Sequence, residues 1–151
     1  MQVSHLMSSP PETCRARTQL AQAAKMMAEY NCGCLPVVDD ADHLIGLITD
    51  RDIALMVAGR HKNPWQIAVR EAMTKGVVSC APDDSIDKAL TTFTELGVRR
   101  LPVVDQAGRV KGVLSIDDLV LNAGVAGLSE DAVLRTIRAV CSAETGRLIE
   151  R

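Results

Sequence analysis

The chain has 151 residues, 47% of them hydrophobic, which suits one compact domain or two small subdomains that share a core. Its formal net charge of −2, without a long run of one sign, argues against an electrostatic nucleic-acid binder and gives no reason to expect an anionic membrane as partner. Only Tyr30, Trp65 and Phe93 are aromatic, so we predict an aliphatic core and do not expect recognition by base stacking.

The opening residues and the cysteines indicate a cytoplasmic protein. The segment MQVSHLMSSP lacks the basic and apolar regions of a signal peptide, and no apolar run is long enough to span a bilayer. The five cysteines form an odd, scattered set, which is typical of reduced thiols in a cytosol. We therefore expect a cytoplasmic protein that binds neither nucleic acid nor a membrane.

A short strand and an amphipathic helix are the first predicted elements. The strand is expected at residues 12–15, and Thr18 is placed to cap the helix that follows. Apolar residues at positions i, i+3, i+4 and i+7 form one stripe, which is typical of a helix with one buried face. The stripe comprises Leu20, Ala23, Ala24 and Met27.

Two apolar runs joined by a polar turn then predict a hairpin. The runs cover residues 35–38 and 44–48, and residues 39–43 form the turn. A second helix is expected over residues 50–58. The first half of the chain therefore has the order strand, helix, strand, strand, helix.

The second half repeats the first at an offset of 66 residues. Leu-Pro-Val-Val-Asp at residues 35–39 recurs at residues 101–105, and no gap is needed between residues 7 and 53. The same offset relates Met7 to Met73, Cys14 to Cys80, Glu29 to Glu95, Gly46 to Gly112, and Asp52 to Asp118. An identity of this length in a gapless register predicts two copies of one supersecondary unit.

The second copy predicts the same elements as the first. A strand is expected at residues 77–80, a helix capped by Asp84 or Ser85, a hairpin of residues 101–104 and 110–114, and a helix over 116–122. The stripe of its first helix comprises Ile86, Ala89, Leu90 and Phe93.

The connecting segments complete the prediction. Residues 59–64 contain helix breakers and predict a linker, and residues 65–73 are expected to form an approach helix. Ser129 is placed to cap a last helix, whose predicted buried face comprises Val133, Ile137 and Val140. We therefore expect repeat one at residues 7–58, a linker and approach helix at 59–72, repeat two at 73–122, and a C-terminal helical extension at 123–151.

The motifs of the two copies resemble the CBS-domain family. They are the Leu-Pro-Val-Val-Asp strand, Gly-Leu-Ile-Thr-Asp-Arg-Asp at residues 46–52, and Gly-Val-Leu-Ser-Ile-Asp-Asp at residues 112–118. The resemblance covers about residues 7–122 and is closest in plan to stand-alone bacterial proteins with two CBS repeats. It implies an α/β fold of the α+β type, in which two βαββα repeats pack with pseudo-two-fold symmetry as a Bateman module, here followed by a C-terminal helix.

The resemblance also implies a ligand and an assembly. CBS pairs commonly bind an adenosine-type compound, namely AMP, ADP, ATP or S-adenosylmethionine, and commonly form homodimers. We expect the dimer surfaces on the helices at residues 20–30, 51–58 and 86–96. No cofactor is expected to be required.

The pattern Gly-x-x-Thr/Ser-x-x-Asp is the strongest candidate site. Thr49 and Ser115 are each expected at a helix N-cap, with Asp52 and Asp118 three residues later. A hydroxyl there can donate to a phosphate, and the carboxylate can accept from ribose hydroxyls. The same spacing also forms a capping box, which needs no ligand.

Further site residues follow from the resemblance. It implies ligand contacts in the loop before each Leu-Pro strand and in the opening strand of the opposite repeat. Arg100 is a candidate phosphate partner because guanidinium matches phosphate geometry; Cys34 stands at its place in repeat one, so we expect the repeat-two pocket to be the better phosphate site. The implied residues are Cys32, Cys34, Val98, Arg100, Thr13 for the pocket of Asp118, and Val77 and Ser79 for the pocket of Asp52.

No catalytic constellation can be assembled from the sequence. The three histidines lie in the tail, a turn and the linker, and Cys32-Gly33-Cys34 has no His or second Cys pair at zinc spacing. We therefore expect a regulatory module rather than an enzyme, signalling through conformation or dimer packing to a partner that the sequence does not identify. The alternative is a ligand-free structural dimerisation module with vestigial pockets, and a thiol or metal enzyme would need a reactive cysteine.

Overall fold

The chain folds into two units, each built around one sequence repeat. The computed structural model describes residues 1–149, with side chains through residue 143. The repeat-one unit contains residues 11–77 and 106–110, and the repeat-two unit contains residues 1–10, 78–105 and the chain from Lys111 onward. The first ten residues thus fold with repeat two, and residues 106–110 of the second hairpin fold with repeat one.

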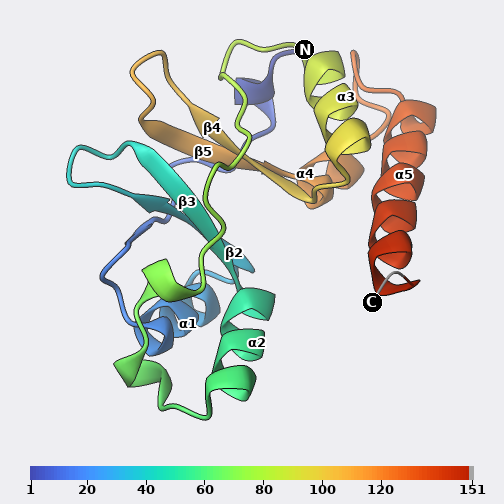
Figure 1. The fold of residues 1–151 in the computed structure, drawn as a ribbon. Helices are drawn as coiled ribbons and strands as arrows, with labels where there is room; N and C mark the ends of the chain where they lie inside the picture. The colour runs from blue at the N-terminus through green and yellow to red at the C-terminus, as the bar shows by residue number, and fades with distance from the viewer. Residues whose placement is uncertain (150–151) are drawn as a thin grey trace. The chain divides into compact units, whose positions relative to one another are not determined.

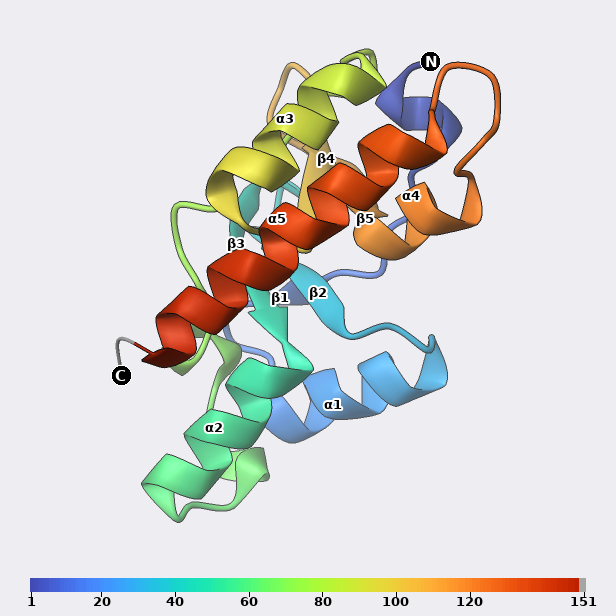
Figure 2. The same cartoon turned by 90° about the vertical axis from the view of Figure 1, so that its right-hand side faces the viewer.

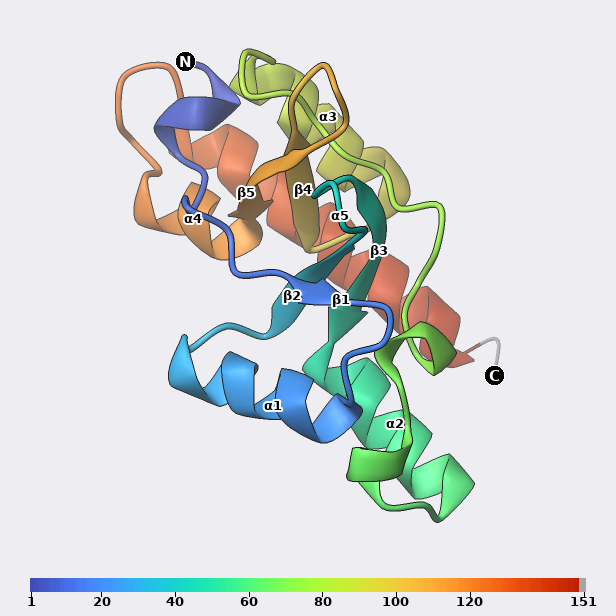
Figure 3. The same ribbon diagram turned by 90° about the vertical axis from the view of Figure 1, so that its left-hand side faces the viewer.

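The repeat-one unit has a three-stranded sheet in the order β1-β2-β3; Figure 1 labels its strands β2 and β3. β1 (Cys14–Arg15) runs parallel to β2 (Cys34–Val38), which pairs antiparallel with β3 (Leu44–Thr49) in the predicted hairpin. Figure 3 shows β1 and β2 side by side. The opening strand is shorter than the four residues predicted, and it pairs with the sheet of its own repeat.

Helices α1 (Leu20–Glu29) and α2 (Asp50–Arg60) complete the core of this unit. The α1 stripe is buried at Leu20, Ala23 and Met27, but Ala24 is exposed, so its predicted burial is wrong. The Thr18 cap is also wrong, because the Thr18 hydroxyl accepts from the Arg15 N–H and leaves the N-cap position to Gln19.

The segment between the repeats is not the continuous helix predicted for residues 65–73. It forms two short 3₁₀ turns, η2 (Pro64–Gln66) and η3 (Val69–Glu71), separated by extended residues. The backbone there pairs with the residues before α1, because the Leu20 N–H donates to the Ile67 carbonyl and the Val69 N–H donates to Thr18. Tertiary pairing therefore overrides the local helical pattern.

The repeat-two unit has a two-stranded sheet of β4 (Arg100–Val104) and β5 (Val110–Ser115). The strand predicted at residues 77–80 is reduced to one parallel bridge between Cys80 and Val103. Helix α3 (Ile86–Leu96) begins at Ser85, whose hydroxyl accepts from the Lys88 N–H as predicted, and buries its whole stripe. Helix α4 (Ile116–Leu121) follows β5.

The C-terminal helix α5 (Glu130–Ile149) belongs to the core of the repeat-two unit. It lies alongside α3 and also contacts α4 (Figure 2). The Ser129 hydroxyl accepts from the Ala132 N–H as the predicted cap, and Val133 and Val140 are buried with Phe93 and Leu101. None of the described helices is long and apolar enough to cross a membrane.

The segments that precede the two repeats are exchanged. Ser8 pairs antiparallel with Val113 of β5, and Thr74 pairs antiparallel with Leu47 of β3. Each repeat is thus completed by the segment in front of the other, together with a short 3₁₀ turn, η1 (Val3–His5), at the N-terminus.

Candidate functional site

Helix α2 begins with a reciprocal capping box between Thr49 and Asp52. The Thr49 hydroxyl accepts a hydrogen bond from the Asp52 N–H (3.1 Å), and Oδ2 of Asp52 accepts one from the Thr49 N–H (2.9 Å). Both residues are half-buried. The two bonds satisfy backbone donors at the helix start and fix the direction of the carboxylate.

Helix α4 begins with the equivalent box between Ser115 and Asp118. Oδ2 of Asp118 accepts from the Ser115 N–H (2.8 Å) and from the Ser115 hydroxyl (2.7 Å), while the same hydroxyl accepts from the Asp118 N–H (3.2 Å). Both residues are again half-buried. The box at α4 therefore has one more hydrogen bond than the box at α2.

The capping boxes leave one carboxylate oxygen for a ligand. Among the described residues, every hydrogen bond that Asp52 and Asp118 accept through their side chains uses Oδ2. A carboxylate has two acceptor oxygens, so Oδ1 remains able to accept from a hydroxyl. Capping and ribose recognition are thus compatible on the same side chain, because each uses a different oxygen.

The loops before β2 and β4 lie beside these helix starts. The Asp50 N–H donates to the Gly33 carbonyl (3.1 Å), and the Ile116 N–H donates to the Arg99 carbonyl (3.0 Å), which is the same bond at the 66-residue offset. These bonds bring the loop residues implied by the resemblance next to the capping boxes. Cys32 and Cys34 flank Gly33, and Val98 and Arg100 flank Arg99, the two residues whose carbonyls accept these bonds.

The two loops differ in charge. Arg100 is the half-buried first residue of β4, and its counterpart Cys34 is the buried first residue of β2. Repeat two therefore has an arginine at the strand start where repeat one has a cysteine.

The residues assigned to opposite opening strands are divided between the two units. Thr13 precedes β1 in the repeat-one unit, whereas Asp118 lies in the repeat-two unit. Val77 is the last residue of the long segment of the repeat-one unit, and Ser79 belongs to the repeat-two unit. Their roles stay predictions.

Two of the buried cysteines, Cys14 and Cys80, are poor nucleophiles. Burial raises the pKa of the Cys14 thiol to about 12, against a small opposing effect of Arg15. Burial, followed by the carboxylate of Asp84, raises the pKa of Cys80 to about 11. A thiol with a raised pKa is not an activated one. Among the side chains that the structure describes, no group of three or more His, Cys, Asp or Glu residues could hold a metal ion.

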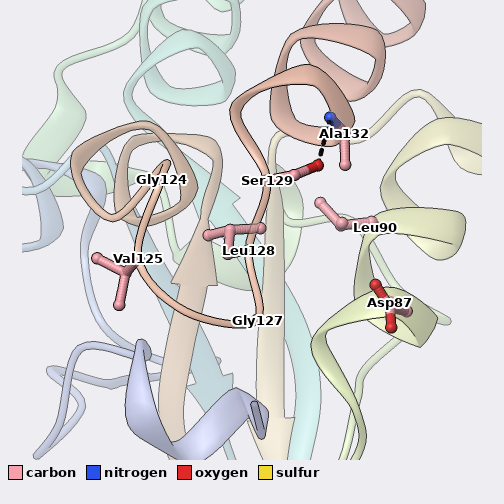
Figure 4. Close-up of a pocket in the computed structure, with 8 residues that line it drawn as sticks. All are labelled: Asp87, Leu90, Gly124, Val125, Gly127, Leu128, Ser129 and Ala132. Atoms are coloured by element: carbon pink, nitrogen blue, oxygen red, sulfur yellow. Dashed lines mark hydrogen bonds between the residues drawn. The ribbon is translucent and has the colours of Figure 1, made fainter.

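Surface hollows lie in each of the two units. One, of about 420 Å³, is formed by the start of α3 and the loop before α5, with Asp87 and Ser129 as its polar side chains (Figure 4). Another, of about 440 Å³, runs along α2 and is called here the α2 groove. Its lining residues are Asp52, Leu55, Met56, Gly59, Arg60 and Ala72.

The α2 groove contains residues that the sequence analysis missed. Of the predicted site residues only Asp52 lines it. The signal was available, since Asp52, Leu55, Met56 and Gly59 stand at i, i+3, i+4 and i+7 and therefore share one helix face. Ala72 could not be anticipated, because the segment that carries it was expected to be helical.

The sequence matches known proteins along most of its length. A family model described as the CBS domain matches residues 3–59 and 69–123. The uncharacterized protein MK0525 of Methanopyrus kandleri is 31% identical over 112 residues, which cover 74% of this chain and 54% of that protein. Inosine-5′-monophosphate dehydrogenase of Aquifex aeolicus is 34% identical over 111 residues, or 73% of this chain and 22% of the enzyme. The chain thus spans about half of MK0525 and about a fifth of the dehydrogenase.

A solved structure has the same fold. The CBS domain pair of protein MJ0100, in complex with 5′-methylthioadenosine and S-adenosyl-L-methionine, is 29% identical with a TM-score of 0.72. The match covers 80% of this chain and 94% of that chain.

Proposed function

Since this chain belongs to the CBS-domain family and carries two CBS repeats, we propose that it is a regulatory module that binds adenosine-type compounds. The ligands considered are AMP, ADP, ATP and S-adenosylmethionine or its relatives. Binding changes the conformation or the dimer packing, and this change is passed to a partner protein. The enzyme relative carries the matching region as about a fifth of its length, which supports a regulatory rather than a catalytic role for it here.

The observation that carries the proposal is that each of the two Asp carboxylates uses only one of its oxygens in the capping box. Oδ2 of Asp52 and of Asp118 accepts the capping-box hydrogen bonds. These bonds fix the orientation of the carboxylate and leave Oδ1 able to accept from a ligand. A carboxylate that is already oriented pays less ordering entropy on binding, so it is a good acceptor for the adjacent hydroxyls of a ribose. The adenosyl ligands of the MJ0100 pair support the same ligand class.

A thermal-shift screen tests the function directly. The protein is heated with AMP, ADP, ATP, S-adenosylmethionine, adenosine and, as a control without ribose, adenine. A ligand that binds the native state raises the melting temperature by mass action. We expect shifts with the ribose-containing compounds and a much smaller shift with adenine. If none of the adenosine compounds shifts the transition at millimolar concentration, the chain is a ligand-free dimerisation module instead.

A further inference from the structure

The segment between the two repeats carries a local excess of positive charge. Its cations between residues 59 and 75 are Arg60, Lys62, Arg70 and Lys75, and its one acidic residue is Glu71, whereas the whole chain has a net charge of −2. Nη1 of Arg60 lies 3.5 Å from Oε1 of Glu71, so this carboxylate is already paired. Lys62 and Arg70 are exposed and form no ion pair within the described part of the chain. They are therefore able to attract a negatively charged partner.

The core of the repeat-one unit fixes the backbone of this segment. Ile67 and Val69 are buried in that core. The Arg70 N–H donates to the Ala16 carbonyl (2.9 Å), which ties the segment to the residues before α1. The exposed cations thus stand on a fixed backbone, and a partner that binds there orders only their side chains.

Trp65 lies in the same segment with much of its ring in water. It is the only tryptophan of the chain and is 45% exposed. Oδ1 of Asn63 accepts from the Trp65 N–H (3.0 Å), and Nζ of Lys25 on α1 lies 5.7 Å from the centre of the ring. In Figure 1 the green segment that follows α2 lies next to α1. Tryptophan often anchors protein interfaces, because its ring buries a large apolar area with little loss of side-chain freedom.

An exposed ring is thus accompanied by exposed cations, and these residues are called here the Trp65 surface. They are Lys25, Arg60, Lys62, Trp65 and Arg70. An acidic segment with an apolar side chain matches them, because its carboxylates can pair with the cations while the apolar group lies on the ring.

The aromatic content disfavours a nucleic acid as the occupant. Proteins that bind single strands usually stack successive bases on several aromatic rings along a basic groove. Among the described residues, only Trp65 of the three aromatic residues lies against one of these cations, and Phe93 is fully buried in the other unit. A protein segment needs only one apolar anchor, so it is the better match.

We propose that the Trp65 surface docks an acidic segment of a partner protein. The ring takes an apolar side chain of the partner, and Lys25, Lys62 and Arg70 take its carboxylates. This inference goes beyond the proposed function, because it assigns a partner class to a surface outside both capping boxes and does not require an adenosine compound to bind.

The fluorescence of Trp65 tests the surface directly, since no other tryptophan contributes. Iodide and caesium ions quench an exposed ring, and cations around the ring concentrate iodide and repel caesium. We expect iodide to quench the parent protein more strongly than caesium does. A peptide of repeated Glu-Glu-Leu should then shift the emission to shorter wavelength and protect the ring from iodide.

Two peptides of the same length are the controls. Repeated Glu-Glu-Ser keeps the charge and lacks the apolar anchor, so it should bind about tenfold more weakly. Repeated Lys-Lys-Leu keeps the anchor and reverses the charge, so it should leave the emission unchanged.

Variants locate the binding, which is followed by the fluorescence anisotropy of labelled peptides. Lys62→Glu combined with Arg70→Glu should weaken the Glu-Glu-Leu peptide about tenfold or more, since two attractions become repulsions. Trp65→Ala should reduce its affinity to that of the Glu-Glu-Ser peptide. Arg51→Glu is the matched control, because Arg51 begins α2 about 14 Å from Arg60, beyond the screening length of about 8 Å at physiological salt. Circular dichroism melts confirm that each variant is folded.

The outcomes decide this inference separately from the proposed function. It is wrong if the Glu-Glu-Leu peptide does not change the emission, if the Lys-Lys-Leu peptide acts equally, or if iodide does not reach the ring. Tighter binding of an oligothymidylate of equal charge, lost in the Lys62→Glu and Arg70→Glu variant, would replace the protein partner by a nucleic acid. The thermal shifts with adenosine compounds test the proposed function alone, and none of these substitutions should change them.

Discussion

The Asp118 side chain is expected to hold both a helix start and a ribose. Replacing it by Asn keeps an oxygen that can accept from the Ser115 N–H, but it removes the charge that strengthens a bond from a ribose hydroxyl. Hydrogen bonds to charged groups are worth about 1.5–3 kcal/mol, so Asp118→Asn should weaken AMP binding about tenfold or more. Calorimetry on the parent and the variant measures the change.

Asp117 provides the matched control for this prediction. It is the exposed neighbour of Asp118 in the first turn of α4, so Asp117→Asn removes the same charge from nearly the same place. The control should bind AMP as the parent does. Nucleotide binding that is equal in the parent and in Asp118→Asn would show that Asp118 serves only as a cap.

Arg100 should make the repeat-two site the better phosphate site. It is half-buried at the start of β4, where repeat one has Cys34. A charge-assisted contact of about 1.5–3 kcal/mol separates the two sites by about one to two decades in affinity. Arg100→Ala should therefore cost most of the affinity for AMP and little of that for adenosine. Arg51→Ala, at an exposed position of α2, should cost less, and a larger loss from Arg51→Ala would reverse the order of the two sites.

The thiols should differ sharply in reactivity. Cys14 and Cys80 are buried, and their raised pKa values of about 12 and about 11 leave little thiolate at pH 8, whereas Cys141 is exposed on α5. Alkylation of the native protein should label Cys141 well before the other two, and mass spectrometry of peptides follows the order. Rapid labelling of Cys14 or Cys80 would reveal an activated thiol and reopen the possibility of thiol chemistry.

At the level of elements, each of the segments that precede the two repeats packs against a glycine of the strand with which it pairs. A Cβ on Gly112 would lie 2.7 Å from the Ser8 carbonyl oxygen, and a Cβ on Gly46 would lie 2.9 Å from the Thr74 carbonyl oxygen. Both contacts are with backbone, which cannot rotate away. Gly112→Ala should therefore lower the free energy of unfolding by about 1–3 kcal/mol, as measured by urea denaturation.

Gly59→Ala is the control for that substitution. Gly59 lies in α2 with free space above it, so alanine there should raise the free energy of unfolding, by up to about 1 kcal/mol. The two substitutions should change the free energy of unfolding in opposite directions, because Gly112 lies against the Ser8 backbone and Gly59 has free space above it. A neutral Gly112→Ala variant would mean that the N-terminal segment does not rest on this strand in solution.

Local patterns predicted the repeated elements well but not their partners. The stripe of α3 is fully buried because α5 covers it, and the equivalent stripe of α1 is open at Ala24, where α3 has Leu90. The periodicity was the same in both helices, so only the tertiary neighbours distinguish them. The prediction of an approach helix over residues 65–73 was wrong for the same reason, since the backbone of this segment pairs with the residues before α1.

The candidate site was predictable where it is local in sequence. Thr49 with Asp52, and Ser115 with Asp118, follow from a three-residue spacing, and both boxes are formed. The pairing of Arg60 with Glu71 joins α2 to the segment beyond the linker, so no spacing rule could have found it. Residues assigned across the two repeats, such as Thr13, depend on an arrangement that neither unit defines by itself.

At the scale of the whole molecule, the proposed function requires that ligand binding change the conformation or the assembly of the protein away from the binding site. A ligand can shift a conformational equilibrium only by the difference in its affinity for the two states. The two candidate sites differ where repeat one has Cys34 and repeat two has Arg100, so we expect them to differ in their preference for phosphate.

The last prediction concerns that assembly. We expect a homodimer through the surface of α1 and α2, because the equivalent face of α3 is covered within its own unit by α5, and Leu90 there is only 7% exposed. On α1 the exposed face carries small residues such as Ala24 and Ala28, and Tyr30 at its end is 48% exposed. Small side chains let two helices approach closely, so a charge placed among them is costly to bury. Static light scattering at about tens of micromolar should give twice the chain mass of 16.2 kDa for the parent.

Ala28→Glu should shift that mass toward a single chain, because two carboxylates would be brought together in a closing helix interface. Ala126→Glu, at an exposed position in the loop after α4, adds the same charge away from α1 and should leave the dimer intact. A parent mass near 16.2 kDa would contradict the dimer itself. A dimer unaffected by Ala28→Glu would instead place the interface on another surface, for which exposed Val120 and Leu121 of α4 are the next apolar candidates. The two results have different consequences. A monomer must signal through its partner alone, whereas a dimer through α4 would join the subunits through the helix that carries Asp118.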